Sequence, residues 1–148
     1  MANTSGFRDK TVIITGASSG LGAALACAFA EAGANLSLFS FEKERQEEVA
    51  DDLRQRGARG SVTIGDVTKP DDCQRLVEAT VSEFGGVDYL IANAGISMWA
   101  RFEDIKDLAV MKKLVDVNYL GAVNCVHYAL PHLKAARGMI VAITSIQS

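Results

Sequence analysis

The sequence predicts an α/β domain in which helices cover both faces of a parallel β-sheet. Along all 148 residues, apolar runs of strand length alternate with longer stretches of helical period, which is typical of strands joined by crossover helices. No repeat, low-complexity run or proline-rich linker interrupts the chain, so residues 1–148 are predicted to form one domain. The five expected strands are Thr11–Thr15, Asn35–Phe39, Val62–Gly65, Val87–Ala92 and Met139–Thr144.

The first two helices are expected between the first three strands. Leu21–Ala32 is rich in alanine and is followed by Gly33, which suits the left-handed position after a helix. Glu42–Arg56 is mostly charged and carries one narrow apolar stripe that includes Val49 and Leu53. This second helix is therefore expected to lie on the surface.

Two further helices follow the third and fourth strands. The third is expected to begin with Thr68 as its N-cap, with Pro70 in the first turn, and to run to about Phe84. The fourth is expected over about Asp107–Ala136, with Pro131 bending it near its end. Small and apolar residues repeat along it at spacings of three and four, namely Leu114, Val117, Gly121 and Cys125.

The fifth strand indicates that the fold continues. Residues 139–143 are apolar without alternation, so both faces of this strand should be covered. Only a few residues follow it before Ser148, and a bare apolar edge strand promotes aggregation. The sequence is therefore expected to be the N-terminal part of a longer single-domain fold, truncated after its fifth strand.

Composition and charge exclude several classes of protein. The formal net charge of -3 leaves no basic excess for binding nucleic acid. The longest apolar helix candidate, Leu21–Ala32, falls short of the roughly 20 residues that a bilayer span needs, and the N-terminus lacks a secretory signal. We therefore expect a cytoplasmic protein with no membrane partner. Cys27, Cys73 and Cys125 show no paired spacing, which predicts buried thiols and no metal site.

A glycine-rich turn, Thr15–Gly22, follows the first strand directly. Gly16 would permit the tight turn, Gly20 would let a phosphate approach the backbone, and Gly22 would let the helix pack against the sheet. The free N–H groups at the start of that helix would then face a pyrophosphate. Such a turn by itself is equally explained as purely structural, but its place between strand and helix favours a nucleotide site.

Four motifs in register resemble the short-chain dehydrogenase/reductase family over essentially the whole chain. They are the T-G-x-x-x-G-x-G turn, Asn93–Gly95 after the fourth strand, Asn118 in the long helix and Ser145 after the fifth strand. The resemblance implies a Rossmann-like doubly wound sheet and NAD(P)-dependent hydride transfer with an alcohol or carbonyl substrate. It also implies a homo-oligomer, dimer or tetramer. The glycine spacing differs from the G-x-x-G-x-x-G of the extended branch, which contains nucleotide-sugar epimerases.

The resemblance also implies which residues contact the cofactor. Asp66 would hydrogen-bond the adenine amino group, although an aspartate here is also a common turn residue before a helix. Asn93 and its two neighbours would support the sheet centre and touch the ribose, while Ala92 stands where the family usually has a second asparagine. The full set of implied cofactor-binding residues is Gly16, Ser18, Ser19, Gly20, Leu21, Gly22, Ser40, Asp66, Val67, Asn93, Ala94 and Gly95.

The choice between NAD and NADP depends on the end of the second strand. A carboxylate at that place normally accepts the ribose 2′-hydroxyl and selects NAD. Ser40 stands there, followed by Phe41, so no carboxylate is expected to repel a 2′-phosphate and the sequence favours NADP over NAD. No arginine occupies the adjoining position, and Lys43 and Arg45 are equally explained as solvated helix residues.

The resemblance implies two catalytic residues. Ser145 would hydrogen-bond the substrate oxygen, and its alternative role is to cap the fifth strand. Asn118 would bend the long helix and hold a proton-relay water; from the residues alone it is a buried polar group that needs partners. In the loop Ile96–Phe102, Met98 and Trp99 would favour an apolar substrate, or Trp99 packs against helices or a subunit.

The family's general acid/base pair, Tyr-x-x-x-Lys, is absent from this sequence. It is expected beyond Ser145, whereas Tyr89, Tyr119 and Tyr128 all precede that serine. We therefore expect the 148 residues alone to be inactive. The alternative function is a non-catalytic dinucleotide-binding sensor or partner-binding module, which would keep the fold without the chemistry.

Overall fold

The computed structural model describes residues 4–145, in which five parallel strands form one sheet. The strand order is β3-β2-β1-β4-β5, so the chain moves outward in one direction from β1 and then crosses back to continue on the other side. This is the topology of a doubly wound sheet and confirms the Rossmann-like prediction. The strands are β1 (Thr11–Thr15), β2 (Asn35–Ser40), β3 (Gly60–Ile64), β4 (Tyr89–Ala92) and β5 (Met139–Ala142).

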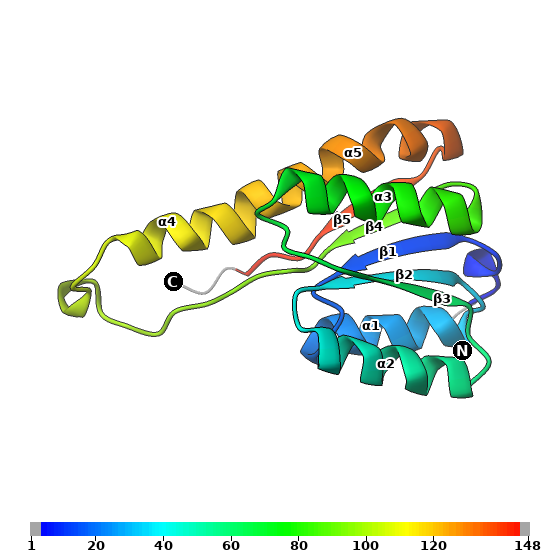
Figure 1. The fold of residues 1–148 in the computed structure, drawn as a ribbon, viewed down its shortest axis with the longest axis horizontal. Coiled ribbons are helices and arrows are strands. Elements are labelled where there is room, and N and C mark those ends of the chain that lie inside the picture. Colours follow the sequence, from blue (N-terminus) through cyan, green and yellow to red (C-terminus); the bar gives the residue numbers. More distant parts are fainter. Residues whose placement is uncertain (1–3, 146–148) are drawn as a thin grey trace.

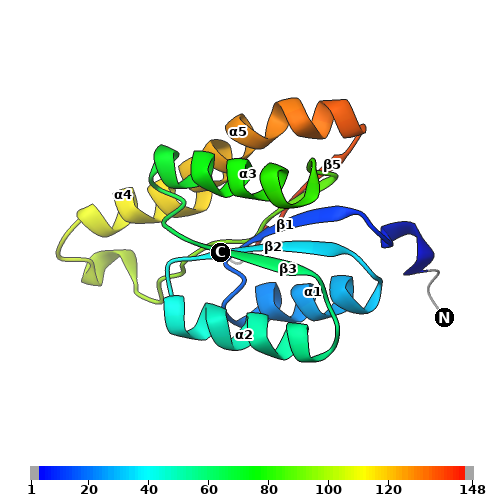
Figure 2. The same cartoon turned by 45° about the vertical axis from the view of Figure 1, so that its right-hand side comes forward.

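Helices cover both faces of the sheet (Figure 1). The helices α1 (Gly20–Glu31) and α2 (Lys43–Gln55) lie on one face. On the other face lie α3 (Pro70–Phe84), α4 (Ala109–Val115) and α5 (Gly121–Ala136), and the turned view separates the two layers clearly (Figure 2). Short 3-10 turns occur at Thr4–Phe7 and Phe102–Asp104.

Two apolar cores lie on opposite sides of the sheet because successive strand residues point to opposite faces. Along β1, Val12 and Ile14 join the core beneath α1 and α2, whereas Ile13 joins the core beneath α3 and α5. Along β4, Leu90 and Ile91 divide in the same way. Burial on both faces explains why these strands are apolar without alternation.

The third helix starts later than the sequence suggests, and Thr68 is not its N-cap. The capping position is Lys69, which makes no side-chain cap bond, and Pro70 opens the helix. The Thr68 backbone N–H and hydroxyl both donate to Asp66 Oδ1 at 2.9 Å. The prediction was wrong because the carboxylate of Asp66 organises a turn one step before the helix.

The long fourth helix is divided by a π-helical segment, η3 (Asp116–Leu120), between α4 and α5. Single π-turns inside α-helices are uncommon and occur frequently at functional sites. Asn118 lies in the middle of this segment, and Pro131 lies inside α5. The predicted single helix is therefore confirmed in extent and corrected in its internal geometry.

Within the described residues, β5 is an edge strand with three of its four residues exposed. Met139 and Ile140 are among the exposed large apolar side chains. The thiols of Cys73 and Cys125 are buried as predicted, whereas Cys27 in α1 is only half-buried. Residues 4–145 include no helix that is both long and apolar enough to cross a membrane.

Candidate functional site

A cleft of about 600 Å³ opens at the carboxyl ends of the strands. It lies where β1 and β4 are neighbours and the strand order changes direction, which is the usual ligand position in open α/β sheets. Its lining combines the turn after β1, the end of β2, the turn after β3 and the loop after β4. Of the residues predicted to bind the cofactor, those that line the cleft are Gly16, Ser18, Ser19, Ser40, Asp66, Val67, Asn93, Ala94 and Gly95.

The remaining three predicted residues, Gly20 to Gly22, form the first turn of α1. Gly20 has φ +53° and open space where a Cβ would stand, so its backbone is accessible. A Cβ on Gly22 would lie 2.1 Å from the Gly16 carbonyl oxygen and 2.7 Å from Asn93 Nδ2. Gly22 therefore lets α1 pack closely against Gly16 and Asn93, which directly follow β1 and β4 at the carboxyl edge of the sheet.

Thr15, at the start of the glycine turn, forms hydrogen bonds with the end of β4 and the loop that follows it. Its Oγ1 accepts the backbone N–H groups of Asn93 at 3.1 Å and Ala94 at 3.0 Å, and it donates to the Ile91 carbonyl at 3.5 Å. The Asn93 amide returns the contact by donating to the carbonyls of Thr15 at 3.0 Å and Gly16 at 3.2 Å. The two walls of the cleft are thus held together by side-chain to backbone bonds.

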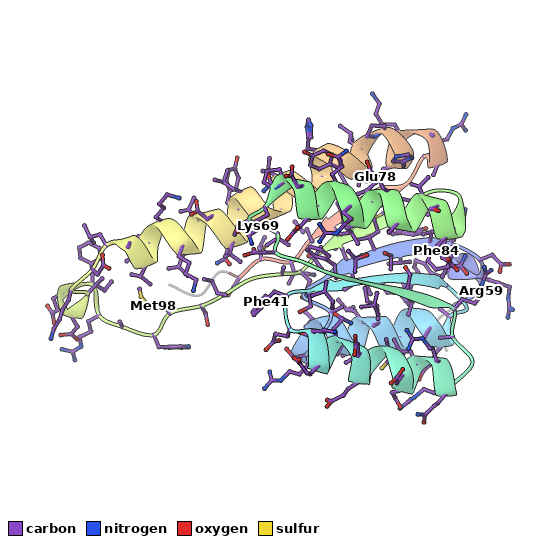
Figure 3. The ribbon with its side chains drawn as sticks, in the orientation of Figure 1. Phe41, Arg59, Lys69, Glu78, Phe84 and Met98 are labelled. Atoms are coloured by element: carbon purple, nitrogen blue, oxygen red, sulfur yellow. The ribbon has the colours of Figure 1, made fainter. Side chains whose placement is uncertain are left out.

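Ser18, Ser40 and Glu42 form a hydrogen-bonded chain at the far end of the cleft. Ser40 Oγ donates to Ser18 Oγ at 3.0 Å, and Ser18 Oγ donates to Glu42 Oε2 at 2.7 Å. The Glu42 backbone N–H donates to Ser40 Oγ at 3.1 Å. Arg45 pairs with the other carboxylate oxygen of Glu42 at 3.2 Å. Phe41 projects from the same loop at the carboxyl edge of the sheet (Figure 3).

Asp66 and Asp72 fix the turn between β3 and α3. The Asp66 backbone N–H donates to Asp72 Oδ2 at 2.8 Å, and this bond, together with Arg75, holds the pKa of the Asp72 carboxyl below its usual range. Asp66 itself organises the turn through Thr68, as described above, and also borders the cleft. The turn-forming role is therefore confirmed, and an adenine contact at Asp66 remains a prediction.

Asn118 contacts the loop after β4 through both atoms of its amide. Its Oδ1 accepts the Ile96 backbone N–H and its Nδ2 donates to the Ile96 carbonyl, each at 2.8 Å. Asn118 is exposed, so its predicted burial was wrong: none of the described residues covers this side of the π-helical segment. Gly95 approaches closely, with an ideal Cβ position 3.4 Å from Asn118 Oδ1.

Ser145 follows β5 at the same edge of the sheet. Ala142, the last residue of β5, pairs in parallel with Ala92, so residues after β5 leave the sheet beside Asn93. The arrangement agrees with a reacting group near the β4 loop, although Ser145 is exposed and does not line the cleft. Residues 4–145 contain no group of three or more His, Cys, Asp or Glu side chains that could hold a metal ion.

Sequence reasoning missed two residues of this site. Thr15 had a signal, because it is a polar residue at the carboxyl end of a strand whose interior is apolar. Glu42 had none: it stands two residues beyond Ser40 at the end of β2, and only the fold shows that its carboxylate turns back to Ser18.

The profile of the short chain dehydrogenase family matches residues 10–148. Together with the doubly wound sheet and the glycine turn at its switch point, this match shows that the chain belongs to the short-chain dehydrogenase/reductase family. The family is one of oxidoreductases that bind a nicotinamide dinucleotide.

Plant relatives are similar over nearly the whole chain. It is 45% identical over 137 residues to the 11-beta-hydroxysteroid dehydrogenase 1A of Arabidopsis thaliana, covering 92% of this chain and 39% of that protein. It is 41% identical over 140 residues to the 11-beta-hydroxysteroid dehydrogenase A of Arachis hypogaea, covering 94% of this chain and 40% of that protein. The chain thus spans less than half the length of these curated relatives.

Solved structures share the fold at similar coverage. An alcohol dehydrogenase from the archaeon Thermococcus sibiricus, complexed with 5-hydroxy-NADP, has 32% identity and a TM-score of 0.83 over 88% of this chain and 56% of that one. A short-chain dehydrogenase/reductase of unknown function from Caenorhabditis elegans, with cofactor, has 32% identity and a TM-score of 0.87 over 95% of this chain and 54% of that one.

Proposed function

We propose that the intact protein is an NAD(P)-dependent oxidoreductase that transfers hydride between a nicotinamide cofactor and an alcohol or carbonyl substrate. One observation carries the proposal: the cleft at the switch point is lined both by the glycine turn, up to Ser19 at the N-cap of α1, and by the loop after β4. Polar groups of the glycine turn and of the loop after β4 meet in this cleft, and because Ala142 pairs with Ala92, the chain that leads to Ser145 leaves the sheet beside that loop.

The residues present fit the diphosphate of a dinucleotide. Ser19 caps α1 without a side-chain bond, so the first N–H groups of the helix keep their donors for a ligand. The open space beside Gly20 lets an oxygen approach those donors, and a Cβ would project into that space. Ser18 and Ser19 border the same region. We infer that these residues bind the phosphates and that Asp66, Val67 and Asn93 to Gly95 bind the adenosine and ribose groups.

The protein's own groups would orient the substrate and manage the proton. The bound nicotinamide supplies the hydride acceptor or donor. We propose that the Ser145 hydroxyl donates a hydrogen bond to the substrate oxygen and so holds the reacting carbon in place. We also propose that Asn118 is a positioning residue, because its amide fixes the Ile96 backbone at the wall of the cleft.

A proton donor is still required, and we propose that it lies beyond the fifth strand. The exposed apolar residues of β5 support a continuing fold, since a strand with this composition is normally covered on both faces. The Tyr-x-x-x-Lys pair of the family would be supplied by that continuation. There the lysine would lower the pKa of the tyrosine so that the phenol exchanges protons near neutral pH.

The substrate is proposed to be an apolar secondary alcohol or ketone. Trp99 is 83% exposed on the loop after β4. Met98 lies on the same extended loop (Figure 3). Because the plant relatives are named hydroxysteroid dehydrogenases, a hydroxysteroid is the first substrate to assay.

We further propose that the protein is a homo-oligomer. Exposed apolar side chains gather along the α4, η3 and α5 segment, including Val115, Tyr119 and Val123. Such a surface favours association with another apolar surface.

The function is tested by steady-state kinetics on the intact protein with a hydroxysteroid and either dinucleotide. Ser145→Ala is expected to lower kcat about 100-fold, the effect of losing one donor to a reacting oxygen, with cofactor affinity unchanged. Ser82→Ala, an exposed serine on α3, is the matched control and should leave kcat unchanged. Full activity in Ser145→Ala would contradict the assignment, and dinucleotide binding without turnover of any alcohol or ketone would favour the non-catalytic module.

A further inference from the structure

We propose that Glu42 is the residue that determines dinucleotide choice and that it makes this protein prefer NAD over NADP. The inference rests on the proposed dinucleotide function and deepens it. It is carried by the chain of hydrogen bonds that joins the glycine turn to the end of β2.

The first step is the position of the carboxylate. Glu42 lies just before α2, yet its side chain turns back into the cleft and reaches Ser18 at 2.7 Å. Bonds at both carboxylate oxygens and at its own backbone N–H hold it there, and the side chain is 32% exposed. An ordered carboxylate of this kind can accept the hydrogen bond of a ribose 2′-hydroxyl.

The second step is the direction of the hydroxyl protons. Ser40 gives its proton to Ser18, and Ser18 gives its proton to Glu42. Both hydroxyl protons are therefore already donated within the group formed by Ser18, Ser40 and Glu42. A 2′-phosphate, which is an acceptor with about -1.5 to -2 charge, would meet an anion and no free hydroxyl donor here.

The third step concerns the nearby cations. Arg45 is paired with Glu42 Oε1, so its charge is directed at the carboxylate. Phe41, which directly follows Ser40, is 71% exposed and carries no charge. The position adjoining the end of β2 thus offers an aromatic ring where a phosphate would need a positive group.

These contacts remove the premise behind the sequence-based preference for NADP. That prediction assumed that no carboxylate reaches the end of the second strand, because Ser40 occupies the usual position. The fold brings the carboxylate of Glu42, two residues after Ser40, to the end of this strand. The competing arrangement has Arg45 releasing Glu42 and binding the 2′-phosphate, and the experiment separates the two.

The test is isothermal titration calorimetry of the intact protein with NAD and NADP, supported by AMP and adenosine 2′,5′-bisphosphate as fragments that differ only in the 2′-phosphate. The unmodified protein should bind NAD at least about tenfold more tightly than NADP. Glu42→Gln keeps the shape of the side chain and removes its charge, so the ratio should fall about tenfold or more, mainly through tighter NADP binding. Arg45→Gln should keep the preference for NAD without loss of NADP binding, because the guanidinium is paired with Glu42 and does not hold the 2′-phosphate.

The matched control is Glu44→Gln, which removes the same charge from an exposed residue in the first turn of α2. It should leave the ratio of the two dissociation constants unchanged. Thermal unfolding followed by circular dichroism verifies that each variant is folded.

Three outcomes overturn the inference. They are a preference for NADP in the unmodified protein, an unchanged ratio in folded Glu42→Gln, and a loss of NADP binding in Arg45→Gln that would show the guanidinium to be the phosphate ligand. If neither dinucleotide binds the unmodified protein, the proposed function fails as well. Binding of both with no response to Glu42 overturns this inference alone.

Discussion

Two neighbouring glycines of α1 have different physical roles. Gly20 is in the left-handed region at φ +53° and faces open space, whereas Gly22 is buried under the carbonyl of Gly16. The first position therefore serves access to the backbone. The second serves the close approach of two backbone segments.

This difference predicts opposite responses to a single methyl group. Gly22→Ala should lower the free energy of unfolding by about 3 kcal/mol, because its Cβ would overlap backbone atoms that cannot move aside. Gly20→Ala should cost only about 1 kcal/mol for the left-handed conformation, but its methyl group should weaken dinucleotide binding about tenfold. Urea unfolding and calorimetric titration of the intact protein measure the two effects. Equal losses of stability in both variants would contradict the assignment.

At the scale of one element, the helix α2 has a polar exposed face and a buried face that contains a polar side chain as well as apolar ones. Of the predicted apolar stripe, Leu53 is buried and Val49 is half-buried, and Ala50 beside them is buried as well. Gln46 lies fully buried on the same helix, and neither its Oε1 nor its Nε2 has a hydrogen-bond partner among the described residues. A buried amide without partners lowers the free energy of unfolding, because no hydrogen bond in the protein replaces the ones it loses to water.

Gln46→Met is therefore expected to raise the free energy of unfolding by about 1 kcal/mol, since methionine keeps the length of the side chain without its polar atoms. Urea unfolding of the intact protein provides the measurement. The control is Gln55→Met at the exposed end of α2, where the change should be within about 0.5 kcal/mol. A clear loss of stability in Gln46→Met would show that the amide is satisfied in solution.

At the scale of the whole molecule, apolar residues bury most of the sheet, but the edge strand β5 stays exposed within the described residues. Two cores cover the sheet from β3 to β4, while β5 leaves its edge and Ile140, which is 40% exposed, in contact with solvent. An exposed apolar edge can pair with another chain.

The 148-residue chain expressed by itself should consequently self-associate in a concentration-dependent way. Ile140→Lys places a charge on the edge strand and should shift the population toward monomer, as seen by sedimentation velocity. Ser82→Lys adds the same charge on the exposed face of α3 and should have no such effect. If both variants associate like the parent chain, contacts through β5 are not responsible.

Much of the fold could be predicted because burial on two faces leaves a direct record in the sequence. The span Thr11–Thr15 is confirmed without change, β2 differs from prediction by one residue at its end, and α1 differs by one residue at each end. The start of α3 was missed, because the side chain of Asp66 competes with Thr68 for the turn. The π-helical segment around Asn118 was also missed, since the resemblance implied only that Asn118 bends the long helix.

The sequence alone determined the parallel sheet and the location of the glycine turn, because these depend on apolar periodicity and on local glycine requirements. Its four motifs in register also indicated the family. Tertiary structure decided which polar groups meet in the cleft. Thr15 joins Asn93 across 78 positions, and Glu42 reaches Ser18 across 24. Such contacts depend on side-chain directions at the ends of neighbouring strands, and no local pattern in the sequence encodes those directions.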